Sequence, residues 1–127
     1  MQLRFKNDLP FISIVVGYKD TEVVIEDVLI DTGSASTILA ADSVERIGIV
    51  PRPDDRLYLI RGVGGNEVVY SRLVDFIEVG DFRLRNFEIE VGAMDYGFGI
   101  SGIMGMDFLT QSGAIIDLRN LSLEFRV

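Results

Sequence analysis

The sequence predicts an all-β fold that carries one or two short helices. Most of the chain consists of short β-branched or aromatic runs bounded by turn residues, as is typical of strands. Thirteen glycines among 127 residues suit a compact fold with many tight turns. No linker or low-complexity segment interrupts the chain. We therefore expect a single domain over residues 1–127, long enough to bury its own core.

Strands are expected at eight places, in chain order at residues 11–16, 22–25, 28–30, 57–60, 66–79, 82–91, 114–118 and 121–127. Residues 28–30 are apolar without alternation, as in a strand that is covered on both faces. The apolar phase slips between Leu84 and Phe87, which predicts a bulge or a bend. Residues 121–127 alternate cleanly, so this strand should be half-buried or laid against a partner chain.

Two short segments are typical of helices. The first begins near Ala41, with Asp42 or Ser43 as its cap, and ends at Gly48. The second covers residues 106–111 and is ended by a glycine two residues later. Both are too short to change the all-β class.

The composition excludes several kinds of catalytic site, because the chain contains neither cysteine nor histidine. Disulfides, thiolate nucleophiles and Cys-ligated metals are excluded by the first absence. Ser-His and Cys-His pairs and His-ligated zinc are excluded by the second. Carboxylates are the leading candidates for proton chemistry, and we expect no metal and no cofactor.

The net charge of −8 argues against nucleic acid or an anionic membrane as a partner. The first ten residues contain charges and lack the apolar segment of a signal peptide. The apolar run at residues 11–16 is too short to span a bilayer. We expect a soluble cytoplasmic protein.

The most informative motif is Asp31-Thr32-Gly33, which occurs once, directly after the apolar run at residues 28–30. It offers one carboxylate on a tight turn at the end of a buried strand. Water activation by carboxylates alone needs two of them face to face, sharing a proton. One such turn can therefore work only if a second copy of the chain supplies the partner. The alternative is an ordinary strand-ending turn in which the aspartate caps the backbone.

Three other patterns have structural alternatives. The cluster at residues 62–65 joins two long strands, and taken alone it is a plain hairpin tip. Residues 97–102 match a dinucleotide fingerprint, but they lack the preceding strand and following helix that this site requires. Asp54 and Asp55 could suggest a cation site, although a solvated turn explains them better.

Three motifs occur in a fixed order along the chain: residues 29–36 (Leu-Ile-Asp-Thr-Gly-Ser-Ala-Ser), the glycine cluster at residues 62–65, and residues 102–109 (Gly-Ile-Met-Gly-Met-Asp-Phe-Leu). With the strands between them, they make the chain resemble the retropepsin-like aspartic proteases over roughly residues 11–126. The resemblance implies a closed, barrel-like acid-protease fold. It also implies an aspartic endopeptidase that acts on peptide or protein substrates as a homodimer, with its active site on the twofold axis.

The resemblance assigns roles to single residues. Asp31 would be catalytic, Thr32 would bridge the two subunits through its hydroxyl, and Gly33 would let the substrate backbone approach closely. The remaining residues implied to contact substrate lie after the catalytic turn, at the flap tip and in the strand beside the turn: Ser34, Ala35, Gly62, Val63, Gly64, Gly65, Ile103 and Met104.

Two departures from the retroviral members stand out. Ser34-Ala35 follows the motif where retroviral enzymes usually have Ala-Asp, and a serine there resembles the pepsin-like pattern, in which its hydroxyl can donate to the carboxylate. Met106-Asp107 follows Gly105, where retroviral enzymes commonly have Arg followed by Asn or Asp.

Three functions are compatible with these patterns. The first is a homodimeric aspartic endopeptidase. The second is a non-catalytic dimer that keeps the fold and binds extended peptides without cutting them. The third, a small β-barrel ligand carrier, leaves the glycine cluster and the single Asp turn unexplained.

Overall fold

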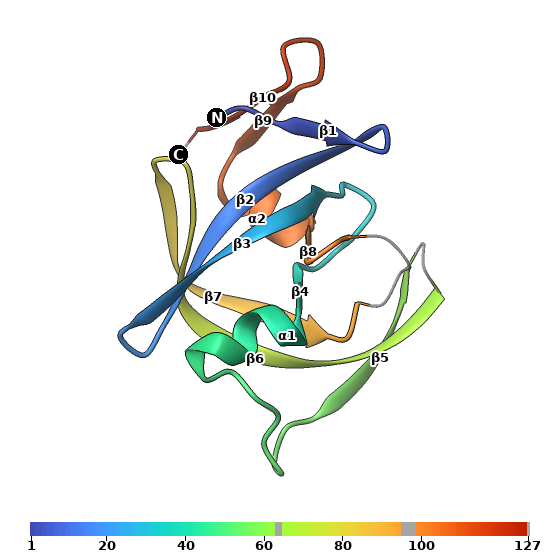
Figure 1. The fold of residues 1–127 in the computed structure, drawn as a ribbon, viewed down its shortest axis with the longest axis vertical. Coiled ribbons are helices and arrows are strands. Elements are labelled where there is room, and N and C mark those ends of the chain that lie inside the picture. Colours follow the sequence, from blue (N-terminus) through green and yellow to red (C-terminus); the bar gives the residue numbers. More distant parts are fainter. Residues whose placement is uncertain (63–64, 95–98, 127) are drawn as a thin grey trace.

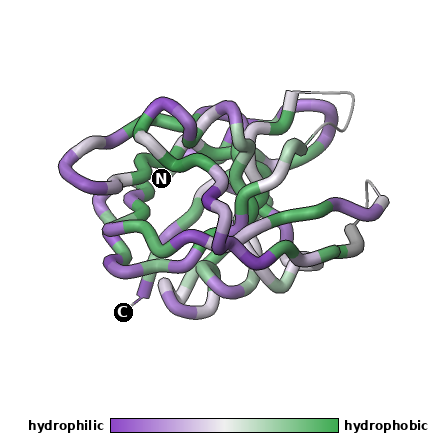
Figure 2. The backbone as a smooth tube through the Cα atoms, turned by 90° about the horizontal axis from the view of Figure 1, so that it is seen from below, coloured by the Kyte–Doolittle hydropathy of each residue, from purple (hydrophilic) through white to green (hydrophobic). Residues whose placement is uncertain are grey.

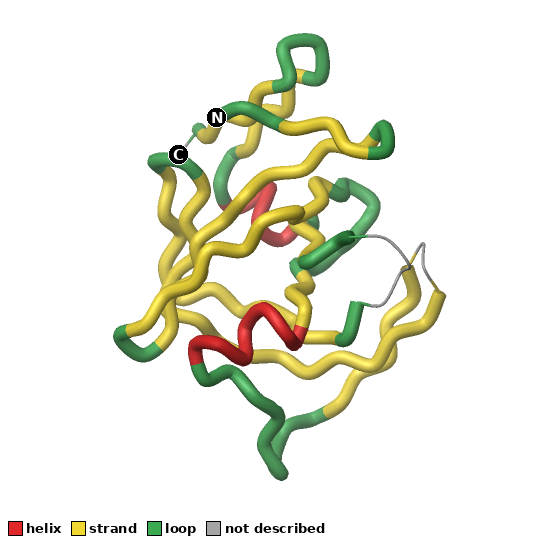
Figure 3. The backbone as a smooth tube through the Cα atoms, in the orientation of Figure 1, coloured by secondary structure: helices red, strands yellow, loops and turns green. Residues whose placement is uncertain are grey.

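The computed structural model describes residues 1–62, 65–94 and 99–126 (Figure 1). Strands dominate the chain, and the helices are short (Figure 3). The strands are β1 (Arg4–Lys6), β2 (Leu9–Tyr18), β3 (Thr21–Ile30), β4 (Ile38–Ala40), β5 (Leu57–Gly62), β6 (Gly65–Val79), β7 (Phe82–Gly92), β8 (Gly102–Met104), β9 (Ala114–Asp117) and β10 (Ser122–Phe125). The helical segments are α1 (Ala41–Val44), the 3-10 turn η1 (Glu45–Ile47) and α2 (Met106–Gln111). The predicted all-β class is confirmed.

Eight strands form one sheet in the order β1-β2-β3-β8-β4-β7-β6-β5, and β2 also pairs with β6. This extra pairing closes the sheet into a ring of strands. The short strand β8 runs parallel to β3 and antiparallel to β4, so it is inserted between two segments that are close in sequence. The ring therefore holds the end of β3, where the Asp-Thr-Gly motif begins, against β8.

A second, smaller sheet contains β9 and β10. The N-terminal residues add to its β10 edge through a bridge between Gln2 and Ser122 and a hydrogen bond from Leu3 N to Leu121 O at 2.7 Å. Both ends of the chain consequently lie close together (Figure 1). Leu123 of β10 is fully buried, so the last strand is held within its own chain.

Apolar side chains form two buried clusters. The main core fills the ring and includes Val16, Leu39 and Phe108. The second cluster contains Phe11, Ile38, Ala40, Val69, Met94 and Ile100. Along the strands, hydrophobic and hydrophilic segments alternate, as expected for sheets with one buried face (Figure 2).

Two local expectations were wrong. The two strands predicted at residues 22–25 and 28–30 are one strand, β3, in which Asp27 takes a φ of 60°. The first helix has Ala40 at its N-cap with no side-chain hydrogen bond, so neither Asp42 nor Ser43 caps it. Its termination at Gly48 is confirmed, with a left-handed φ of 86°.

The predicted irregularity in β7 is a bend rather than a bulge. Asn86 takes a φ of 54°, yet the pairing of β7 with β6 keeps one register on both sides of it. The buried positions change phase in both strands here, from Val74 to Ile77 in β6 and from Leu84 to Phe87 in β7. Because both strands shift together, no net register change results.

Within the described ranges, no helix is long and apolar enough to cross a membrane.

Candidate active site

Asp31 lies at the end of β3, where the chain leaves the sheet. Its backbone N–H donates to the Met104 carbonyl at 3.0 Å, which continues the pairing of β3 with β8 by one residue. The residue is half-buried, and its carboxylate Oδ1 accepts a hydrogen bond from Gly33 N at 2.9 Å. One hydrogen bond thus fixes the Asp31 backbone to β8, and the other fixes the carboxylate to the turn.

The residues after Asp31 face outward. Thr32, Gly33 and Ala35 are exposed, so this turn lies at the surface of the single chain. The Ser34 hydroxyl donates to the Ser36 carbonyl at 2.7 Å, and the expected hydrogen bond from it to Asp31 is not formed. The pepsin-like role suggested for Ser34 is therefore wrong in this conformation, because the serine side chain stabilises its own loop.

The N-terminus of α2 anchors the loop that carries the motif. Met106 N donates to Ser34 O at 2.7 Å, and Asp107 N donates to Ala35 O at 3.2 Å. Gly105 lies so close to the loop that an added Cβ would be 2.3 Å from the Ser36 carbonyl oxygen. Glycine is therefore required at residue 105 for this loop to lie against the helix.

A buried threonine and an aspartate complete the anchor. Thr37 is fully buried, and its N–H and hydroxyl donate to the Asp107 carboxylate at 3.1 and 2.7 Å. The Thr37 Oγ1 in turn accepts a hydrogen bond from Gly105 N at 3.1 Å. The motif at residues 102–109 drew attention to Asp107, but nothing in the local pattern indicated Thr37.

Strand β8 places its side chains on opposite sides. Ile103 is half-buried and packs against the second cluster, which Val69 and Met94 also form. Met104 is fully buried in the main core. The burial of Met104 lends no support to its expected contact with substrate, which stays a prediction. Ile103 keeps an accessible side.

The glycine cluster lies at the end of a hairpin formed by β5 and β6, which projects from the ring (Figure 1). The described pairing runs from Leu57 with Tyr70 to Gly62 with Gly65, and Gly65 takes a φ of 107°. Val63 and Gly64 lie outside the described residues. We call residues 57–62 and 65–69 the flap.

Other predicted patterns do not form sites. Among the described residues, no group of three or more acidic side chains could hold a metal ion. Asp55 forms an ion pair with the buried Arg72, with Oδ2 and Nη2 2.6 Å apart. Gly102 begins strand β8 and no helix, which agrees with rejecting the dinucleotide fingerprint, and residues 97–98 lie outside the described part of the chain.

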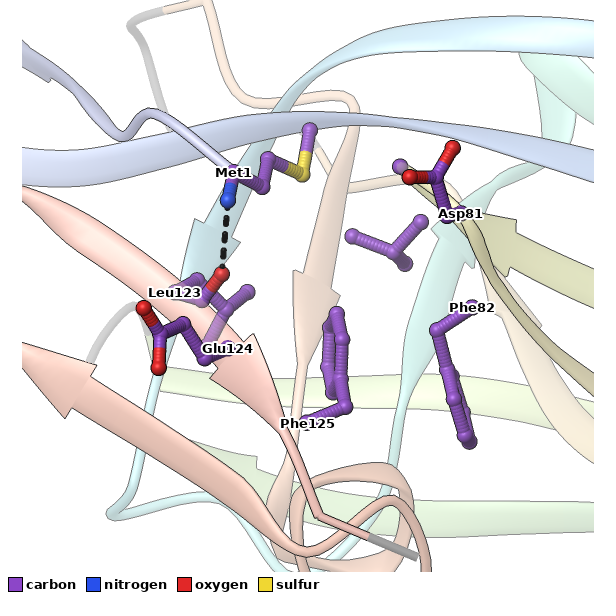
Figure 4. A pocket seen from close by; sticks show the side chains of 8 residues that line it. Met1, Asp81, Phe82, Leu123, Glu124 and Phe125 are labelled. Atoms are coloured by element: carbon purple, nitrogen blue, oxygen red, sulfur yellow. Dashed lines mark hydrogen bonds between the residues drawn. The ribbon is translucent and has the colours of Figure 1, made fainter.

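A cavity of about 490 Å³ lies away from the Asp31 turn, between the chain ends and the turn that joins β6 to β7. The rings of Phe82 and Phe125 stack at 4.7 Å on its apolar side, and the Met1 amino group donates to Leu123 O at 2.9 Å (Figure 4). Asp31 and the flap contribute nothing to its lining.

Known proteins resemble this chain in sequence pattern and in fold. Residues 16–108 match the aspartyl protease family. The fold is similar to that of the EIAV protease complexed with the inhibitor HBY-793, with 24% identity, a TM-score of 0.63, and coverage of 91% of this chain and 98% of that one. It is also similar to a retropepsin-like aspartic protease from Rickettsia conorii, with 19% identity, a TM-score of 0.65, and coverage of 97% and 95%. No curated protein matches the sequence significantly.

The family match covers most of the chain and includes the Asp31 turn, the flap and β8. The two solved structures agree with it in fold over nearly the whole length. The chain therefore belongs to the aspartyl protease family and has the retropepsin-like fold.

Proposed function

We propose that the protein is an aspartic endopeptidase that works as a homodimer, with Asp31 of each protomer in one active site. The observation that carries this proposal is Asp31, a half-buried residue on a surface turn that is anchored by α2. A turn held this firmly can keep a carboxylate in a fixed direction. One protomer supplies one such group, and the chemistry needs two.

The proposed mechanism follows from two carboxylates about 3 Å apart, which cannot both be ionised and therefore share one proton. The ionised Asp31 takes a proton from a bound water, and the protonated one polarises the peptide carbonyl. Water attack gives a tetrahedral diol, and proton transfer to the nitrogen expels the amine. Because the two groups titrate as a pair, we expect a bell-shaped pH dependence with its maximum at acidic pH.

The flap and the strand beside the turn would bind the substrate. Gly62 and Gly65, which pair with each other near the end of the hairpin, carry no side chain that would keep an extended peptide from the flap backbone. Closure of such a hairpin over the peptide would exclude water. Ile103, with its accessible side, would contact an apolar substrate side chain, and the exposed backbone at Ala35 would contact the substrate chain.

Exposed apolar residues and a free strand edge support the homodimer. Met106 and Ile115 are each 38% exposed. Met106 begins α2, the helix that anchors the Asp31 turn, and Ile115 lies in β9. Within the described residues, β9 pairs only with β10, so its other edge is available to a second copy. A twofold contact uses the same surface on both protomers, so the β9 edges of two copies could pair with each other.

Comparison of the wild type with Asp31→Asn on an unfolded protein substrate, from about pH 3 to about pH 8, tests the proposal. We expect the variant to lose at least about a hundredfold in rate, because an amide at residue 31 cannot take the proton from the attacking water. Asp54→Asn, in an exposed carboxylate of the loop before β5, should cleave like the wild type.

The state of the dimer must be measured on the same samples. Loss of activity with the dimer retained supports the endopeptidase. Negligible cleavage by wild type and variant alike would contradict it and favour the peptide-binding dimer.

A further inference from the structure

A carboxylate lies at the base of the flap, where the flap separates from the ring. Strand β6 is paired with β7 up to Tyr70 and Val91. Beyond that pair, β6 continues into the flap, and Glu67 is paired across the hairpin with Ile60. The Glu67 side chain reaches back towards the segment that follows β7.

A backbone N–H after β7 donates a hydrogen bond to this carboxylate. Met94 N donates to Glu67 Oε1 at 2.5 Å. Met94 is itself buried and takes a φ of 56°, a left-handed conformation that is costly for a residue with a side chain. The strained residue thus directs its N–H at the glutamate.

The chain also leaves space for the carboxylate. A Cβ added at Gly92 would lie 2.9 Å from Glu67 Cδ and 3.0 Å from Oε1. Contacts that close do not occur for real Cβ atoms, so any side chain at residue 92 would displace the glutamate. The space that holds the Glu67 carboxylate therefore depends on Gly92 on one side and on the left-handed Met94 on the other.

The contact lies beside the second apolar cluster, which links the flap to β8. Met94 and Val69 belong to the second cluster, against which Ile60 of the flap and Ile103 of β8 also pack. A flap that swings away from the ring must move Glu67 relative to Met94. The same movement would loosen the apolar contacts of β8, the strand that pairs with β3 beside the Asp31 turn.

We propose that Glu67 is a positioning residue that latches the base of the flap to residues 92–94 and so sets how readily the flap opens. The effect of this latch on substrate binding rests on the proposed function, in which the flap covers a bound peptide. The latch itself is a property of the folded chain and can be measured without any activity.

Hydrogen exchange of backbone amides tests the latch, because it reports local opening at single residues. In Glu67→Ala, we expect the Met94 amide to exchange at least about tenfold faster than in the wild type, while the core amides of Ile77 and Ile89 keep their rates. Glu78→Gln is the matched control, since Glu78 lies on the same strand and binds Arg83 at the surface. In Glu78→Gln, the Met94 amide should exchange at the wild-type rate.

Two results would overturn the latch. One is an unchanged Met94 rate in Glu67→Ala, and the other is an equal acceleration of the core amides, which would mean global rather than local opening. If Glu67→Ala does not fold, Gly92→Ala tests the same contact, because its methyl group displaces the carboxylate from the space that holds it.

Kinetics separate the latch from the proposed function. With the wild type active, Glu67→Ala should raise KM at least about threefold and leave kcat within about twofold, because a flap that opens readily holds substrate less well. An unchanged KM would contradict the coupling to substrate. An inactive wild type would instead reject the endopeptidase and leave the exchange result to decide the latch.

Discussion

Tyr18 and Tyr70 are two buried tyrosines whose hydroxyl groups are in opposite situations. The Tyr18 oxygen accepts a hydrogen bond from Arg52 Nη2 at 2.9 Å. The Tyr70 hydroxyl has no hydrogen-bond partner among the described residues. Burial raises the pKa of the Tyr70 phenol, although the nearby Arg72 charge lowers it in part. For Tyr18, burial also raises the pKa, but the nearby positive side chains of Arg72, Lys19 and Arg52 outweigh it and the net pKa is lowered.

Removal of the two hydroxyl groups should therefore have different effects on stability. Tyr70→Phe removes a buried group that gains nothing in the fold, so we expect the protein to become more stable by about 0 to 1 kcal/mol at neutral pH. Tyr18→Phe removes a hydrogen-bond acceptor from Arg52 and should cost about 1 kcal/mol. Denaturant unfolding of both variants measures the difference. A clear loss of stability in Tyr70→Phe would mean that the Tyr70 hydroxyl makes a stabilising hydrogen bond after all.

The Tyr70 variant also has a predicted pH dependence. A folded pKa above the unfolded value means that the stability contribution is fully present below the unfolded pKa and is lost as the pH rises through the folded pKa. The wild type should consequently lose stability above about pH 10 more steeply than Tyr70→Phe does.

At the scale of elements, the loop between η1 and β5 is fixed to β6 by a buried ion pair. Arg72 of β6 is only 6% exposed, and its Nη2 donates to Asp55 Oδ2 at 2.6 Å and to the Val50 carbonyl at 3.3 Å. The same Asp55 oxygen accepts Arg52 N at 2.6 Å. This loop leads directly into β5, so the ion pair holds the first strand of the flap at its origin.

Breaking this pair should destabilise the protein strongly. Arg72→Met removes the cation and leaves the Asp55 carboxylate largely buried without its charge partner, which we expect to cost about 3 kcal/mol. The contrasting pair is Arg83 with Glu78, at 2.9 Å and about one third exposed. Glu78→Gln should change the free energy of unfolding by less than about 1 kcal/mol. Equal losses in the two variants would show that burial does not control the strength of these pairs.

At the scale of the whole molecule, the sequence predicted what local patterns can encode. Alternation and turn residues located most strands, and the spacing of three motifs indicated the family. Some errors were local, such as the cap of α1 and the division of β3 into two strands. What the sequence could not indicate concerns contacts between distant segments. Met104 is buried because β8 is inserted between β3 and β4, and that insertion has no local signal. Thr37 and Asp107 are separated by 70 residues, and only folding brings them together.

Association of two chains is the property on which the proposed chemistry depends, and the β9 edge gives it a specific test. Ile115→Lys places a charge on an exposed apolar residue of that edge. In a twofold contact the charge would be buried opposite its own copy, so we expect the dimer dissociation constant to rise at least about tenfold. Sedimentation over a range of concentrations measures it, and cleavage per chain should fall on dilution in parallel.

The control for this prediction is Val24→Lys on β3, an equally simple change at an exposed aliphatic residue. It should leave the dissociation constant unchanged, because Val24 lies in the hairpin of β2 and β3 rather than on the β9 edge. Equal weakening by both variants would mean that charge alone drives the chains apart. No weakening by Ile115→Lys would place the twofold contact elsewhere, and the two Asp31 turns would then have to meet without help from β9.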